Sequence, residues 1–186
     1  IYPIDPQSQK IGVVVGDVSE HGIPSAILMA STRAFIRQRA ALEGNISTLV
    51  NDVNFQFTRD MENSGRFMTL FFLSINFGKN SLEWVRAGHD AAIIDDPSAG
   101  SFEELKGKGL ALGIDSGYKY QENKKNGFEP DQIIALGTDG LWEAVNLNGE
   151  MFGRNRVRDM IRQNAHKSAN EIVNGILASV EAFSKT

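Results

Sequence analysis

The sequence predicts an α+β fold in which helices cover a sheet or a pair of sheets. Three observations support this prediction: two helical patterns near the start, a run of strand patterns in the middle, and two more helical patterns at the end. With 186 residues, 41% hydrophobic and 23% charged, the chain is long enough for one domain with a substantial core. We therefore expect a single domain over residues 1–186.

The first strong strand pattern is the nearly continuous apolar run Ile11–Val15. Such a run is typical of a strand that is covered on both faces. It leads into Asp17, and Gly16 and Gly22 bracket the turn that follows. A buried strand that ends in a carboxylate just before a tight turn is a rigid way to hold a metal ligand.

Two helices and an antiparallel meander should follow. Pro24 suits the first turn of a helix that extends to Leu42, and a second amphipathic helix should begin at Ile46 and end before Ser64. From Phe67 the apolar period changes to that of strands. The segments 67–77 and 81–87 should pair as a hairpin around Gly78-Lys-Asn80, with a further short strand at 91–94.

The remaining patterns predict irregular structure, short strands and two helices. The glycine-rich segment 107–113 should be irregular, whereas 118–121 and 132–136 are predicted strands. A helix should open at Phe152-Gly-Arg-Asn155, with its apolar residues turned inward. The sequence Ser168-Ala-Asn-Glu171 is a capping box and should start the last helix.

The composition excludes several classes of function. The net charge is -4 and the basic residues are scattered among acids, so no electrostatic footprint for nucleic acid is present. The absence of cysteine removes disulfides, thiolate zinc sites and cysteine nucleophiles, and it fits a reducing, cytoplasmic location. The longest uncharged apolar stretch, 67–77, is about half the length that spans a bilayer, and no signal peptide is visible.

A second predicted strand end repeats the arrangement at Asp17. The apolar run 132–136 is followed by Gly137, Thr138 and Asp139. Two carboxylates presented in the same way suggest one shared site, and oxygen ligands suit Mg²⁺ or Mn²⁺. Asp17 is our candidate bridge between two such ions, the Val18 carbonyl is a candidate further ligand, and Asp139 would bind one ion. An Asp at a strand end, taken singly, more often caps a turn.

Six motifs then occur in order, and together they carry a resemblance to a known family. They are Gly16-Asp-Val-Ser-Glu-His-Gly22 with Ile23-Pro-Ser-Ala-Ile-Leu-Met-Ala30, Phe67-Met-Thr-Leu70, Ala87-Gly-His89, Leu110-Ala-Leu-Gly-Ile114, Thr138-Asp-Gly-Leu-Trp-Glu-Ala144, and Phe152-Gly153. With these motifs the chain resembles the PPM-type, or type 2C-like, metal-dependent serine/threonine phosphatases. The most similar branch is the bacterial one typified by stage II sporulation protein E.

The resemblance implies a central antiparallel β-sandwich flanked by helices in α-β-β-α layers, with terminal strands missing from this chain. In that family the residue matching Asp17 binds two Mn²⁺ or Mg²⁺ ions, the residue matching Val18 adds its backbone oxygen, and the residue matching Asp139 binds one ion. Asp17 and Asp139 are thereby the implied catalytic residues. The implied activity is hydrolysis of phosphoserine or phosphothreonine, on a phosphorylated partner such as an anti-sigma-factor antagonist.

The set of metal ligands is expected to be incomplete. Two doubly charged ions call for about four carboxylates, and the family supplies the others from segments that these residues do not contain. Asp5 and Asp95-Asp96 are poor substitutes because of their places in the sequence. Since the chain begins at Ile1 without Met, we expect it to be part of a longer regulatory protein, and a homodimer is left open.

Two other classes of function compete with the phosphatase hypothesis. The first is a regulatory binding module that keeps the fold without catalysis. The second is a serine hydrolase using Ser19, His21 and Asp17, which is a poor hypothesis because three residues so close in one turn do not easily adopt the required geometry.

Four polar residues near the motifs have alternative roles. His21 and His89 are candidates for donating to a phosphate or relaying a proton, and each is equally well explained as orienting its own turn. Glu20 stands where the family commonly has Gly, and a solvated turn residue is the simpler interpretation. Thr69 lies in a strand motif and should pack there.

Overall fold

The computed structural model describes the backbone of residues 2–5, 9–42, 44–61 and 64–185, and the side chains of all of these except 2–5. The chain divides into two compact units, Ile1–Ala91 with Leu105–Phe128, and Ala92–Glu104 with Glu129–Thr186. Within the described ranges, none of the helices combines the length and the apolarity that crossing a membrane requires.

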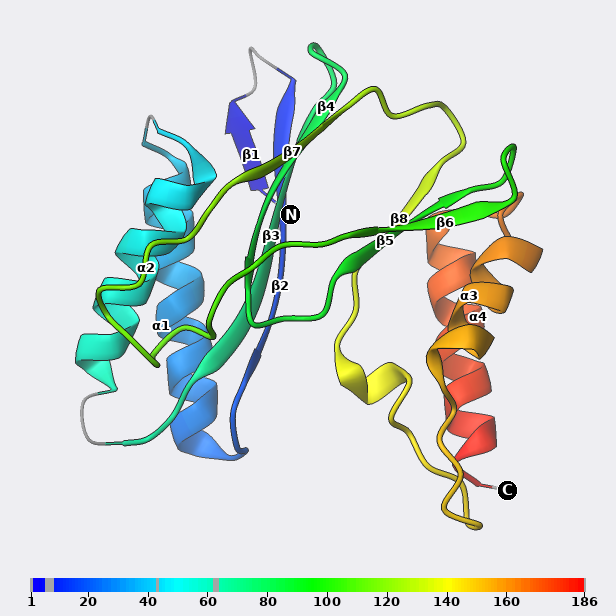
Figure 1. The fold of residues 1–186 in the computed structure, drawn as a ribbon. Helices are drawn as coiled ribbons and strands as arrows, with labels where there is room; N and C mark the ends of the chain where they lie inside the picture. Colours follow the sequence, from blue (N-terminus) through cyan, green and yellow to red (C-terminus); the bar gives the residue numbers. More distant parts are fainter. Residues whose placement is uncertain (1, 6–8, 43, 62–63, 186) are drawn as a thin grey trace. The chain divides into compact units, whose positions relative to one another are not determined.

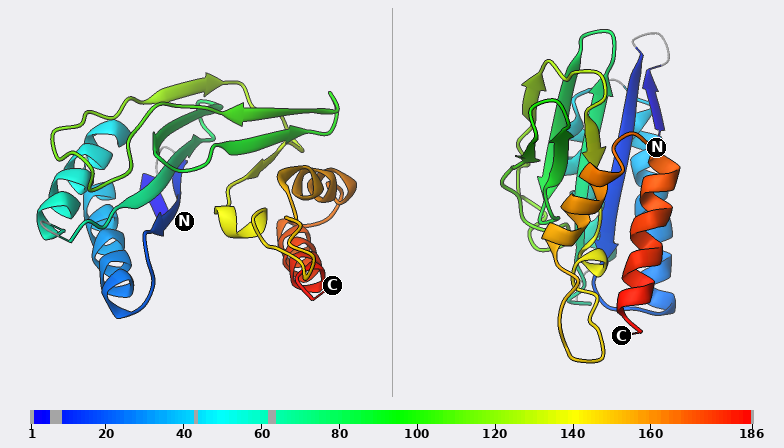
Figure 2. Two further views of the ribbon diagram at one scale, coloured as in Figure 1. Left: turned by 60° about the horizontal axis from the view of Figure 1, so that its bottom comes forward. Right: turned by 90° about the vertical axis from the view of Figure 1, so that its right-hand side faces the viewer.

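The first unit holds a five-stranded antiparallel sheet and two helices (Figure 1). The strands, in their order across the sheet, are β1 (Tyr2–Asp5), β2 (Lys10–Val18), β3 (Met68–Asn76), β4 (Ser81–Ala87) and β7 (Asn123–Asn126). The helices α1 (Ile23–Ala40) and α2 (Ile46–Asp60) lie side by side on one face of this sheet (Figure 2). The expected helix pair and the hairpin of β3 and β4 are confirmed.

The core of the first unit lies between its helices and its sheet. Val50, Val53 and Phe57 of α2 belong to one buried cluster with Leu70 and Phe72 of β3, and each is at most 3% exposed. The spacing of the α2 residues places them on one face of the helix. Burying a side chain of this size contributes about 1.5–3 kcal/mol. This cluster therefore fixes α2 on the sheet.

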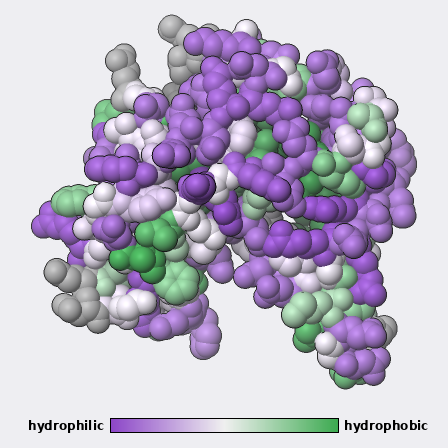
Figure 3. Space-filling view, in the orientation of Figure 1, coloured by the Kyte–Doolittle hydropathy of each residue, from purple (hydrophilic) through white to green (hydrophobic). Residues whose placement is uncertain are grey.

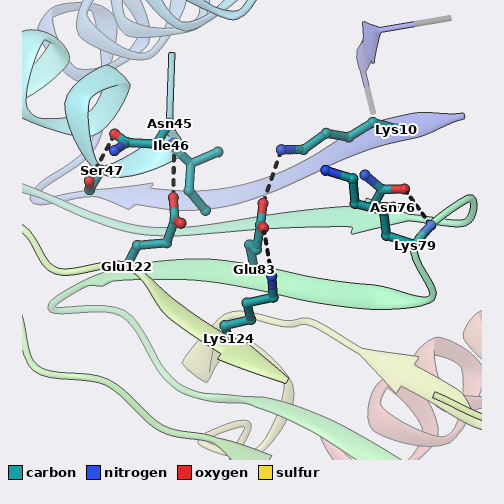
Figure 4. Close-up of polar contacts among 9 residues, drawn as sticks. All are labelled: Lys10, Asn45, Ile46, Ser47, Asn76, Lys79, Glu83, Glu122 and Lys124. Carbon is teal, nitrogen blue, oxygen red and sulfur yellow. Dashed lines mark hydrogen bonds and ion pairs between the residues drawn. The ribbon is translucent and has the colours of Figure 1, made fainter. Parts of the chain in front are cut away.

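Polar contacts fix the start of α2. The side chain of Asn45 accepts a hydrogen bond of 2.8 Å from the Thr48 backbone N–H, which satisfies one of the free donors of the first turn. The Glu122 carboxylate accepts another, of 3.2 Å, from the Ile46 N–H (Figure 4). Glu122 comes just before β7, so the same contact ties that strand to the helix.

A row of charges crosses the sheet of the first unit. Glu83 of β4 pairs with Lys10 of β2 at 3.0 Å and with Lys124 of β7 at 3.7 Å (Figure 4). The Glu83–Lys124 pair joins neighbouring strands and contributes a few tenths of a kcal/mol up to about 1 kcal/mol, whereas the Glu83–Lys10 pair reaches across β3. The Glu83–Lys124 pair also favours a single alignment of the polar edge strand β7 on β4.

The second unit holds a three-stranded sheet and two helices. Its strands, in order, are β6 (Ser101–Leu105), β5 (Ala92–Asp96) and β8 (Ile133–Ala135). A single 3₁₀ turn, η1 (Asp139–Leu141), precedes the helices α3 (Arg154–Gln163) and α4 (Ala169–Phe183). A second buried cluster joins the helices, and it consists of Phe152, Val157, Ile161, Ile172 and Ile176.

A hairpin between η1 and α3 exposes apolar side chains. Val145 pairs with Met151 across it, and these two residues and Leu147 are each more than half exposed. The Asn146 side chain accepts hydrogen bonds from the N–H groups of Asn148 and Glu150, which shapes the turn. Figure 3 shows hydrophobic residues at this tip, at the lower right of a mainly hydrophilic face.

The α+β prediction is confirmed, because the residues that the structure describes form two antiparallel sheets and four helices. The prediction of a strand at 118–121 is wrong. These residues form no strand, and the nearby strand is β7 at Asn123–Asn126. The Tyr118 and Tyr120 rings pack edge to face at 4.9 Å against the α2 core, and the Tyr120 N–H donates to the Asn51 side chain rather than to a strand. Burial raises the pKa of the Tyr120 hydroxyl, which donates to the Leu110 carbonyl.

The predicted capping box at the start of α4 is also confirmed. The Ser168 hydroxyl accepts from the Glu171 N–H, and the Glu171 carboxylate accepts from the Ser168 N–H. Ser168→Ala should lower the free energy of unfolding by about 1 kcal/mol in urea titrations at pH 7. Ser179→Ala, within the same helix, should cause no loss, because Ala favours helix interiors. Equal stability of the Ser168→Ala variant and the wild type would contradict the cap.

The same cap predicts a response to acid. Hydrogen bonds from the Ser168 side chain and backbone lower the pKa of Glu171 below its usual 4.5. A lowered pKa means that the carboxylate stabilises the fold above pH 4.5, and that this contribution fades as the pH falls below that value. Wild type should therefore be more stable than Glu171→Gln at pH 7, and the two should converge in urea titrations carried toward about pH 3. A difference that stays constant with pH would count against this role.

Candidate functional site

Asp17 is the next-to-last residue of β2, which extends to Val18. It pairs with Thr69 of β3 in the antiparallel register. Its side chain is exposed, and no partner for its carboxylate is found among the residues that the structure describes. A carboxylate that is held by a long paired strand and left open to solvent is suited to bind a hard cation.

The turn after Asp17 is tied to its neighbours by hydroxyl groups. The Ser19 N–H donates to the Phe67 carbonyl at 2.9 Å, and the Ser19 hydroxyl accepts from the Phe67 N–H at 3.0 Å. The Ser25 hydroxyl of α1 donates to the Ser19 carbonyl. Ser19 therefore has a structural role, which argues against a serine nucleophile at this position. His21 is exposed.

Glu20 lies in this turn in the left-handed region, with φ of 66°. Glycine adopts this conformation most easily, so Glu20 holds a backbone conformation that is uncommon for a residue with a side chain. Glu20 is exposed, as expected for a turn residue, but its carboxylate is paired. The Arg66 guanidinium donates to it through Nε at 3.0 Å and Nη2 at 2.9 Å.

Thr69 connects the strand beside Asp17 to the turn at Gly88 and His89. The Thr69 hydroxyl and His89 Nδ1 share a hydrogen bond of 2.8 Å, and His89 is only 5% exposed. Gly88 has φ of 69°, and a Cβ at this position would lie 2.9 Å from the Ala111 nitrogen. The buried His89 fits an orienting role better than direct donation to a phosphate. The sequence predicted that Thr69 packs within its strand, whereas in the structure its hydroxyl bonds to His89. The only sign of this bond in the sequence was a single Thr within an apolar strand.

Asp139 lies in the second unit, as the first residue of η1. Its side chain is exposed, and within the described residues nothing pairs with its carboxylate. Its backbone carbonyl accepts from the N–H groups of Trp142 and Glu143, so the turn is internally bonded. The Arg154 guanidinium lies 4.5 Å from the centre of the Trp142 ring and packs over the turn. The predicted Asp-containing turn after a short strand is thus present.

The residues present fit a hard divalent cation by their chemistry, because they offer carboxylate and backbone oxygen. Asp17 and Asp139 belong to different units, and their sharing of one metal site stays a prediction. In the part of the chain that the structure describes, no three His, Asp or Glu side chains are grouped so that they could hold a metal ion. The side chain of Asp5 lies outside the described residues.

Asp95 and Asp96 have other partners. Asp95 is buried and pairs with Arg162 of α3 at 3.3 Å. The Asp96 carboxylate accepts from the Ser98 hydroxyl, the Ala99 N–H and the Gln132 side chain, and these bonds lower its pKa to about 2. Both acids therefore shape the second unit.

Comparison with known proteins gives relatives over nearly the whole chain. Residues 7–186 match the family model of Stage II sporulation protein E (SpoIIE). The phosphoserine phosphatase RsbU of Bacillus subtilis is 26% identical over 179 residues, which are 96% of this chain and 52% of the relative. The chain thus spans about half the length of that curated relative.

Solved structures share the fold. The SiaA PP2C domain of Pseudomonas aeruginosa aligns with a TM-score of 0.76 and 20% identity, over 95% of this chain and 74% of that one. RsbX in complex with magnesium aligns with a TM-score of 0.67 and 18% identity, over 95% and 75% of the two chains. Because the family model covers the chain from residue 7 to its end, the chain belongs to the Stage II sporulation protein E (SpoIIE) family.

Proposed function

We propose that this chain is a protein phosphatase domain that hydrolyses phosphoserine or phosphothreonine without a covalent intermediate. The observation that carries the proposal is Asp17, an exposed carboxylate without a partner among the described residues, at the end of a paired strand in a chain of this family. The relative RsbU is a phosphoserine phosphatase by name, which supports the reaction class.

In this proposal Asp17, the Val18 carbonyl and Asp139 would hold two Mn²⁺ or Mg²⁺ ions, Asp17 taking part in binding both and Asp139 in binding one. The magnesium in the RsbX structure supports the choice of a hard cation. When bound, such ions supply an activated water and stabilise charge on the phosphoryl oxygens. The protein's part is to fix the ligands. The pairing of β2 with β3 and the bonded turn at Asp139 restrict the movement of both carboxylates.

The proposal also includes the class of substrate. We expect a phosphorylated protein, with an anti-sigma-factor antagonist as the leading candidate, and a cytoplasmic location. A single phosphatase domain over 1–186 within a longer regulatory protein, and a homodimer, also stay predictions. The relative RsbU, about twice as long as this chain, is consistent with additional regulatory segments.

The test is hydrolysis of an aryl phosphate by the full-length protein with Mn²⁺ present. Asp17→Asn and Asp139→Asn should each lower kcat/KM by about a hundredfold or more, because each removes a charged metal ligand. Asp159→Asn, an exposed acid on α3, makes the same charge change and should keep the wild-type rate. A chelator should abolish the activity.

Other outcomes identify the competing hypotheses. Unchanged rates in both site variants would refute the assignment of Asp17 and Asp139. Hydrolysis that survives chelation would favour a serine hydrolase. A folded full-length protein that binds its partner but hydrolyses no phosphoester would favour the regulatory binding module.

A further inference from the structure

The first unit has a depression beside the turn that follows Asp17. It has a volume of about 510 Å³, within the usual range of ligand sites. The end of α2 forms one wall, the turn at 113–116 forms another, and Gly65 and Arg66, just before β3, form the third. All of these segments belong to the same compact unit.

The walls of the depression are fixed by buried contacts. Asn54 of α2 is fully buried, and its side chain donates to the Asp115 carbonyl at 2.8 Å and accepts from the Gly113 N–H at 3.1 Å. A Cβ at Gly113 would lie 2.9 Å from the Phe57 ring and 3.0 Å from the Arg66 carbonyl. The turn therefore packs closely on α2 and on the approach to β3, so the depression is already formed in the free chain.

Two guanidinium groups line this depression in a chain whose net charge is -4. Arg59 is exposed, lies 5.6 Å from the centre of the Phe55 ring, and has no carboxylate partner among the described residues. Arg66 pairs with Glu20, whose side chain is 59% exposed. Ile114, which is 56% exposed, adds an apolar contact. The lining thus suits an anionic segment that also carries some apolar surface.

The depression adjoins the proposed catalytic position. Arg66 directly precedes Phe67, whose backbone bonds to Ser19, two residues after Asp17. A polypeptide with its phosphorylated residue at Asp17 would therefore place neighbouring residues next to Arg66.

We propose that the depression binds acidic side chains flanking the phosphorylated residue of the protein substrate, with Arg59 and Arg66 as the residues that determine specificity. In the free chain Arg66 forms an ion pair with Glu20. On binding, a carboxylate of the substrate replaces the Glu20 carboxylate in this pair. This inference rests on the proposed phosphatase function.

The test compares two phosphoserine peptides with the full-length protein and Mn²⁺. One peptide carries Asp and Glu around the phosphoserine, and the other carries Asn and Gln. The acidic peptide should have a kcat/KM about tenfold higher, and Arg59→Gln or Arg66→Gln should each reduce this ratio about threefold to fivefold. Arg33→Gln, an exposed Arg on α1, should leave the ratio unchanged. About 1 M NaCl should remove the preference, since it screens exposed charges.

Binding of the unphosphorylated peptides, followed by fluorescence anisotropy, separates this inference from the phosphatase proposal. The acidic peptide should bind more tightly than the neutral one, and Arg59→Gln should reduce the difference about threefold to fivefold even if no phosphoester is hydrolysed. Equal binding and equal kcat/KM for both peptides would overturn the inference while leaving the phosphatase function intact. Competition by inorganic phosphate without any binding of the acidic peptide would also overturn it, because the depression would then be a simple anion site.

Discussion

The pairing of β2 with β3 is the interaction on which the first unit depends. All nine residues of β2 pair with β3, from Lys10 opposite Asn76 to Val18 opposite Met68. A shift of one residue would turn every side chain of β2 to the other face of the sheet. The register therefore decides both which residues meet the core under α1 and α2 and where the Asp17 carboxylate lies.

The β3 strand carries this register to the other polar residues of the site. Leu70 and Phe72 fix one face of β3 in the core. Thr69, which directly precedes Leu70, pairs with Asp17 of β2 and bonds to His89. The close approach of Ala111 to Gly88 holds the chain at His89 against the strand. A single packed strand thus positions groups from three separate segments of the sequence.

Charge is distributed unevenly around this strand end. The Asp17 carboxylate is exposed, whereas the neighbouring depression carries Arg59 and Arg66. A phosphorylated residue with acidic neighbours would need cations at both places: metal ions at the Asp17 carboxylate for the phosphate, and guanidinium groups beside it for the neighbouring acids. The Glu20–Arg66 pair shows that a carboxylate already fits against this wall.

The sequence by itself determined the helices, the hairpin of β3 and β4, the capping box of α4 and the two strand-end aspartates, because each depends on residues close together along the chain. The ordered family motifs predicted the fold and pointed to the reaction class that we propose. Only the tertiary structure decided the contacts between Thr69 and His89, 20 residues apart, and between Glu20 and Arg66, 46 residues apart. It also decided that the polar segment Asn123–Asn126, and not Tyr118–Gln121, pairs with β4. Long-range packing made these choices, since buried tyrosines and paired charges have no local periodicity that the sequence could display.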